Sequence, residues 1–156
     1  MTKTLIAIDH SPSAMQAVAY AAAHFAGVKD HQIGIIHVLP NLPAMFWDEG
    51  HILSEDEKRE RKKVVDKWLA DQKASMEPVF RKAVEKLVAS GISSGNIRSK
   101  SLSDSIDVAA SILEEAKDGG YQTLVLGRRG LSPVKRFLLG SVTSKIINHG
   151  AGLRFV

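Results

Sequence analysis

The segment with the clearest potential for chemistry lies near the end of the chain. There, Gly127-Arg-Arg-Gly130 is followed, after nine intervening residues, by Gly140-Ser-Val-Thr143. Glycine permits positive φ and close approach of a ligand to the backbone, and N–H groups at a helix start point toward a bound anion. Ser141 and Thr143 add hydroxyls at the same place. Positive charges surround it, at Arg128, Arg129, Lys135 and Arg136. This combination predicts a phosphate-binding loop.

A strand before this loop and a helix after it would hold the loop in place. Residues 123–127 are apolar enough for a buried strand, and residues 141–149 have the pattern of a helix. The order differs from the standard G-x-x-x-x-G-K-[ST] loop, because no lysine stands between Gly140 and Ser141. A second interpretation therefore stays open, in which Gly140 serves only a turn at the strand end and the helix is N-capped.

Strand and helix patterns alternate along the chain, which predicts an α/β fold in a single domain over residues 1–156. Strands are expected at 3–9, 32–39, 96–102, 123–127 and 153–156. Helices are expected at 13–26, 54–90, 104–118 and 141–149. The first strand is an uninterrupted apolar run, as is typical of a strand buried on both faces. We therefore expect an open, five-stranded parallel sheet with helices on both faces.

Local signals mark where several of these elements start and stop. Ser11 is the expected N-cap of the first helix, with Pro12 in its first turn and Gly27 at its end. Pro78 lies inside the long helical pattern and should kink or divide it, because its nitrogen cannot donate a hydrogen bond. Residues 44–53, rich in large side chains, are expected to form an ordered loop that covers another part of the protein.

The carboxyl ends of the predicted strands provide further candidates, because open parallel sheets bind ligands there. Ala7 and Val38 lie at such ends, and Asp9 follows the first strand. The Asp9 carboxylate can accept hydrogen bonds from a ribose hydroxyl or an adenine amine, or hold a magnesium ion. An alternative role for Asp9 is to cap the next helix. The six histidines show no metal-ligand spacing; His37 is expected to be a hydrogen-bonded core residue and His10 to face the site.

Composition narrows the classes of function. The chain has no cysteine, which excludes disulfides, thiol catalysis and cysteine-ligated metals. No apolar run reaches the roughly 18 residues of a membrane span, and no signal-peptide pattern precedes the first strand, so we expect a cytoplasmic protein without a membrane partner. The net charge of +4 accompanies a mixed acidic and basic run at 55–63, which predicts a solvated helix face with local ion pairs rather than a nucleic-acid surface.

The spacing G-x2-G-x9-G-[ST], met by Gly127, Gly130, Gly140 and Ser141, resembles the ATP-binding signature of the universal stress protein family. The first strand with its acidic end and the second strand, Ile35-Ile-His-Val38, are also similar to that family. The resemblance implies a Rossmann-like fold of the adenine nucleotide alpha hydrolase-like type, and ATP as ligand, with or without Mg²⁺ or Mn²⁺. It implies adenosine contacts at Asp9 and the backbone of Ala7 and Val38, and phosphate contacts at Gly127, Gly130, Gly140, Ser141 and Val142, with Thr143 nearby.

No complete catalytic set accompanies these residues. No Ser/His/Asp order occurs with a nucleophile-elbow sequence, and no second acidic residue stands beside Asp9. These features predict an ATP-binding module that acts in stress response or signalling through nucleotide-dependent conformation or assembly. One alternative is a slow ATPase or autophosphorylating protein with Ser141 or Thr143 as acceptor, and another is a nucleotide-free dimerisation scaffold. The family's last strand is its common dimer contact, so the resemblance also implies a homodimer.

Overall fold

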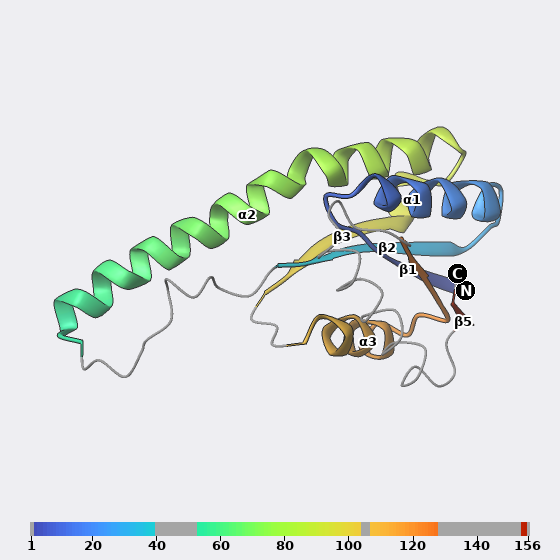
Figure 1. The fold of residues 1–156 in the computed structure, drawn as a ribbon. Helices are drawn as coiled ribbons and strands as arrows, with labels where there is room; N and C mark the ends of the chain where they lie inside the picture. The colour runs from blue at the N-terminus through green and yellow to red at the C-terminus, as the bar shows by residue number, and fades with distance from the viewer. Residues whose placement is uncertain (1, 40–52, 104–106, 128–153, 156) are drawn as a thin grey trace.

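The computed structural model of the chain describes residues 2–39, 53–103, 107–127 and 154–155. Its centre is a parallel sheet of five strands in the order β3-β2-β1-β4-β5 (Figure 1). The strands are β1 (Thr2–Ala7), β2 (His31–Val38), β3 (Ile97–Leu102), β4 (Thr123–Leu126) and β5 (Arg154–Phe155). The predicted open, parallel, five-stranded sheet is therefore confirmed.

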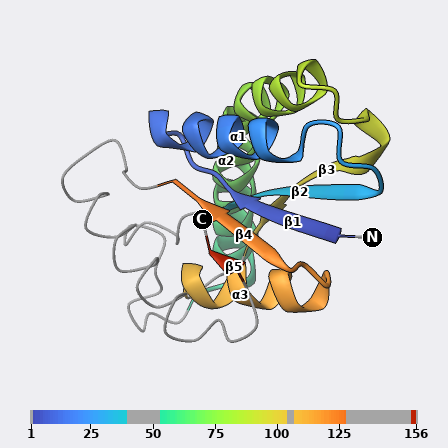
Figure 2. The same cartoon turned by 90° about the vertical axis from the view of Figure 1, so that its right-hand side faces the viewer.

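Helices cover both faces of this sheet, as predicted. Within the described ranges, α1 (Pro12–Phe25) and α2 (Glu55–Ala89) lie on one face and α3 (Val108–Asp118) lies on the other (Figures 1 and 2). Neighbouring residues of β1 supply the two cores, because successive side chains of a strand point to opposite faces. Ile6 belongs to the core under α1 and α2, whereas Leu5 belongs to the core under α3. Both side chains are fully buried.

The first helix begins and ends at the predicted residues. Ser11 is the N-cap in an extended conformation, and Pro12 occupies the first turn. Gly27, just beyond the helix, has a φ of +75°, a conformation that glycine adopts without a steric penalty. The buried face of α1 consists mainly of small side chains, including Ala14, Ala17, Val18 and Ala21, and this allows the helix to pack closely on the sheet.

The second helix continues through Pro78, so the prediction that this proline divides it is wrong. Met76 lies on one side of Pro78, and Phe80, Ala83 and Leu87 lie on the other, all buried in the same core. Packing on both sides of the proline offsets the lost hydrogen bond, since helix stability in proteins comes largely from tertiary contacts. The half of α2 before Met76 projects beyond the sheet (Figure 1).

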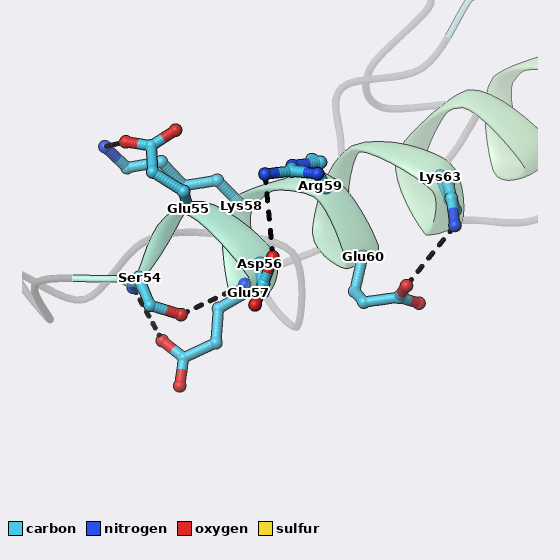
Figure 3. Close-up of polar contacts among 8 residues, drawn as sticks. All are labelled: Ser54, Glu55, Asp56, Glu57, Lys58, Arg59, Glu60 and Lys63. Carbon is cyan, nitrogen blue, oxygen red and sulfur yellow. Dashed lines mark hydrogen bonds and ion pairs between the residues drawn. The ribbon is translucent and has the colours of Figure 1, made fainter.

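The projecting start of α2 is stabilised by its own side chains (Figure 3). Ser54 Oγ accepts the N–H of Glu57 at 3.2 Å, and the Glu57 carboxylate accepts the N–H of Ser54 at 3.0 Å, which is a capping box. Ion pairs three residues apart follow, between Lys58 and Glu55, Arg59 and Asp56, and Lys63 and Glu60. The predicted solvated face with local ion pairs is confirmed for this run. Such exposed pairs contribute little stability each.

The third helix begins later than predicted. Asp107 is its N-cap in an extended conformation, and its carboxylate accepts the N–H groups of Ala109 and Ala110 at 3.0 and 3.4 Å. The predicted start at residue 104 is therefore wrong, because the local acceptor at Asp107 sets the boundary. The predicted helix at 141–149 and nearly all of the loop at 44–53 lie outside the described residues. No helix in the described ranges combines the length and apolar character needed to cross a membrane.

Candidate functional site

Three strands end side by side at the carboxyl end of the sheet. Ala7, the last residue of β1, pairs with Ile36 of β2 on one side and with Leu126 of β4 on the other. Val38 ends β2 two residues further along, and Gly127 follows β4 directly. The structure therefore brings the described backbone positions of the predicted site to one end of the sheet.

The direction of the strand order reverses between β1 and β4. From β1 the chain steps through α1 to β2 and through α2 to β3, then returns through α3 to β4 on the other side of β1 (Figure 2). Asp9 follows β1 and Gly127 follows β4, so these residues lie on the two sides of the reversal. Open α/β sheets bind ligands at the carboxyl ends of their strands at this kind of position.

Asp9 is half-buried in the turn between β1 and α1. Its Oδ1 accepts the backbone N–H of Ser11 at 2.7 Å, the only hydrogen bond of Asp9 among the described residues. Because Ser11 is the N-cap, Asp9 supports the turn that precedes the helix rather than capping a first-turn N–H group. This bond fixes the carboxylate through one oxygen, and Oδ2 can accept further donors.

The two serines at the start of α1 form a buried pair. Ser11 and Ser13 are 5% and 6% exposed, and their Oγ atoms lie 2.8 Å apart. Although Ser11 occupies the predicted N-cap position, its side chain makes no capping hydrogen bond. Its hydroxyl is directed to Ser13 instead. The sequence gave only a weak signal for this pair, the Ser-Pro-Ser segment directly after the turn.

Gly127 lies against the backbone of the same helical turn. A Cβ at this position would lie 3.0 Å from the carbonyl oxygen of Ser13, 3.1 Å from its carbonyl carbon and 3.1 Å from its Oγ. Two of these atoms are backbone atoms of a helix, which cannot move aside as a flexible side chain can. Glycine is thus required here for close packing of α1 against the end of β4, independently of any ligand. The sequence contained no signal for this long-range contact.

Two histidines connect this end of the sheet to α2. His37 is 8% exposed and its Nδ1 lies 3.0 Å from the carbonyl oxygen of Ile8, so the predicted hydrogen-bonded core histidine is confirmed. His10 is exposed, and its ring meets that of His37 edge-on with centroids 6.0 Å apart. The hydroxyl of Ser75 donates to the Gln72 carbonyl at 2.7 Å, so His10 Nε2, 3.3 Å away, acts as the donor to Ser75 Oγ.

The remaining members of the predicted site lie outside the described residues. They are Arg128, Arg129, Gly130, Gly140, Ser141, Val142 and Thr143. In the part of the chain that the structure describes, no group of three or more histidines and carboxylates is arranged to hold a metal ion. The described site therefore consists of backbone from three strand ends, one anchored carboxylate and the first turn of α1.

Solved structures of universal stress proteins share this fold. UspA from Lactobacillus plantarum is 19% identical, with 99% of this chain and 95% of that chain covered and a TM-score of 0.67. A family protein from Arabidopsis thaliana with AMP bound is 18% identical, with 100% and 90% covered and a TM-score of 0.63. A protein from Archaeoglobus fulgidus in complex with dAMP is 18% identical, with 100% and 96% covered and a TM-score of 0.56. A further neighbour was solved in complex with cAMP.

Sequence similarity extends over nearly the same length as the shared fold. Universal stress protein YxiE of Bacillus subtilis is 26% identical over 151 residues, which cover 92% of this chain and 90% of that protein. The sequence model of the Universal stress protein family matches residues 1–151. Since this match includes both the described sheet and the glycine-rich segment, the chain belongs to the universal stress protein family.

Proposed function

We propose that the chain binds an adenine nucleotide, ATP, at the carboxyl ends of β1, β2 and β4. The observation that carries the proposal is the position of Asp9 and Gly127 on the two sides of the strand-order reversal. Structural neighbours that hold AMP, cAMP and dAMP support an adenine nucleotide as the ligand class. In this proposal the protein acts in stress response or signalling through nucleotide-dependent conformation or assembly.

The nucleoside half of the proposed site is formed by the ends of β1 and β2. Asp9 is held through Oδ1 by the N–H of Ser11, which leaves Oδ2 as an acceptor for a ribose hydroxyl or the adenine amine. The backbone of Ala7 and Val38 flanks this carboxylate at the ends of neighbouring strands. A carboxylate that is already oriented loses little conformational freedom when the ligand binds, which favours affinity.

The phosphate half begins where Gly127 leaves β4. The glycine spacing of the sequence supports backbone N–H donors as the main phosphate contacts, because fixed donors at a helix start suit an anion. Arg128 and Arg129 add positive charge. The proposed phosphate contacts are Gly127, Gly130, Gly140, Ser141 and Val142, with Thr143 nearby.

Analysis of the bound ligand tests this proposal directly. Mass spectrometry of the small molecules released from freshly purified, denatured protein should detect an adenine nucleotide. Calorimetric titration of the ligand-free protein with ATP should show one binding event per chain, with GTP as the matched control for the base. Absence of adenine nucleotide from the released fraction, together with no heat on titration, would contradict the proposal.

Incubation with ATP and Mg²⁺ separates binding from turnover. The proposed binding module should return ATP intact after hours of incubation, with no phosphate on the protein. Release of ADP, or phosphorylation of Ser141 or Thr143 detected by peptide mass spectrometry, would favour the slow ATPase or autophosphorylation alternative. A protein that binds no nucleotide but assembles normally would favour the dimerisation scaffold.

We also infer that the protein forms a homodimer. The strand β5 stands at the edge of the sheet, paired on one side with β4 through Thr123–Arg154 and Leu124–Phe155. An edge strand can pair with its copy across a two-fold axis. Sedimentation velocity at high micromolar concentration should show a species of twice the chain mass of 17.0 kDa. A single monomeric species under these conditions would rule the dimer out.

A further inference from the structure

A continuous series of contacts crosses the first turn of α1, from the end of β1 to the end of β4. Asp9 Oδ1 accepts the N–H of Ser11 at 2.7 Å, and Ser11 Oγ lies 2.8 Å from Ser13 Oγ. Ser13 in turn lies against Gly127, where its carbonyl oxygen and Oγ define the space available to that residue. The first turn of α1 thereby connects the nucleoside half of the proposed site to its phosphate half.

The serine hydroxyls in this series have a specific partner rather than a general capping role. Both side chains are almost fully buried, and a buried hydroxyl is destabilising unless it forms a hydrogen bond. Ser11 does not use its hydroxyl to cap the helix, although it occupies the capping position. The hydroxyl pair instead links the N-cap to the residue that contacts Gly127.

We propose that the Ser11–Ser13 hydroxyl pair is a positioning device for the phosphate half of the nucleotide site. The inference rests on the proposed function. Backbone donors bind phosphate well only when their geometry is held within a fraction of an ångström. By fixing the first turn of α1, the pair fixes the backbone at Gly127, from which the phosphate-binding segment continues. Neither serine contacts the ligand in this proposal.

Comparison of ATP with adenosine tests the inference, because only ATP uses the phosphate half. Ser11→Ala and Ser13→Ala each remove the hydroxyl pair from a different side, so one variant substitutes for the other if one fails to fold. Each should weaken ATP binding about three- to tenfold, the equivalent of one neutral hydrogen bond, and leave adenosine binding unchanged. The double variant should bind ATP no more weakly than either single variant, because both remove the same interaction.

A matched control is available at the opposite end of the sheet. Ser90 is also a helix-terminal serine, and its Oγ donates to the Leu87 carbonyl at 2.6 Å where α2 leads toward β3. Ser90→Ala removes one hydroxyl far from the proposed site and should leave the affinities for ATP and adenosine unchanged. Circular dichroism and thermal melting verify that each variant is folded.

The outcomes distinguish this inference from the proposed function itself. If the unmodified protein binds ATP and the serine variants lose ATP and adenosine affinity equally, or lose neither, the hydroxyl pair has only a structural role and the inference is wrong. Additive losses in the double variant would also contradict it. If the unmodified protein binds neither ATP nor adenosine, the proposed function fails, and the inference that rests on it fails as well.

Discussion

The two ends of strand β2 each carry a buried histidine, and the two histidines have different surroundings. At the amino end, His31 Nδ1 lies 2.6 Å from Thr2 Oγ1 and Nε2 lies 3.0 Å from Thr4 Oγ1. The ring of His31 also stacks on Phe25, with centroids 4.0 Å apart. At the carboxyl end, His37 bonds to the backbone of β1 beneath the exposed ring of His10. The polar groups at the amino end are therefore satisfied by side chains of the fold.

The difference separates a structural end of the sheet from a candidate ligand-binding end. At the carboxyl end, Asp9 has one oxygen bonded to Ser11, and Gly127 has no room for a side chain. Such an arrangement holds acceptor and backbone groups in place for a ligand. We therefore expect substitutions at the amino end to change the free energy of unfolding alone, and substitutions at the carboxyl end to change nucleotide affinity.

Asp9→Ala should give the largest effect on affinity. Loss of a charge-assisted hydrogen bond should weaken ATP binding by about 1.5–3 kcal/mol, roughly ten- to hundredfold, as measured by calorimetry. Asp9→Asn is the matched control, because its amide oxygen can still accept the N–H of Ser11 while the charge is lost. Unchanged ATP affinity in Asp9→Ala, with a lower melting temperature, would restrict Asp9 to a role in the turn before α1.

Gly127→Ala should reduce both stability and ATP affinity. The new Cβ would lie 3.0 Å from the Ser13 carbonyl oxygen, and such overpacking should destabilise the fold by about 1–3 kcal/mol in chemical denaturation. Gly95→Ala is the matched control, since the nearest atom to a Cβ there is Ser93 Oγ at 3.8 Å. Equal stabilities of the two variants would show that α1 does not pack tightly against the end of β4.

Thr4→Val should affect stability without affecting the ligand. Thr4 is fully buried, and the substitution removes the hydroxyl that pairs with His31 Nε2. The free energy of unfolding should fall by about 0.5–1.5 kcal/mol, measured by chemical denaturation. Calorimetry should find the same ATP affinity as in the unmodified protein. A weaker ATP affinity would mean that the two ends of the sheet are coupled.

The pH dependence of stability should show a smaller effect at the amino end. Burial lowers the pKa of His31 below its ordinary value of 6.5. As the pH falls through 6.5, the unfolded chain binds a proton at this histidine before the folded chain does, so stability declines with falling pH. Chemical denaturation between pH 7.5 and 5 should show a steeper decline for the unmodified protein than for His31→Gln. Parallel curves would assign the decline to other groups.

Elements set by local chemistry could be predicted from the sequence, whereas those set by distant packing could not. Ser11, Pro12 and Gly27 mark the limits of α1 through their own conformational preferences, and the structure places the helix between them. The predicted division of α2 at Pro78 was wrong because contacts with the sheet and α1 stabilise the helix on both sides. The start of α3 was wrong because a nearer cap, Asp107, takes precedence.

The same limit applies to the candidate site. The proximity of Ala7, Asp9 and Gly127 follows from parallel strands whose carboxyl ends meet, so it could be predicted from strand positions alone. The contact of Gly127 with Ser13 could not, because it depends on how a helix packs against a strand more than one hundred positions later in the chain. The glycine pattern predicts a ligand loop but contains no information on this packing.

The central claim, that the carboxyl end of the sheet binds an adenine nucleotide, is tested most directly by NMR titration of ¹⁵N-labelled protein with ATP. The amide signals of Ala7, Asp9 and Gly127 should shift in a saturable manner. Those of Thr4 and His31, at the amino end of the sheet, should stay in place. Saturable shifts confined to the amino end, or no saturable shift at any of these residues, would contradict the claim.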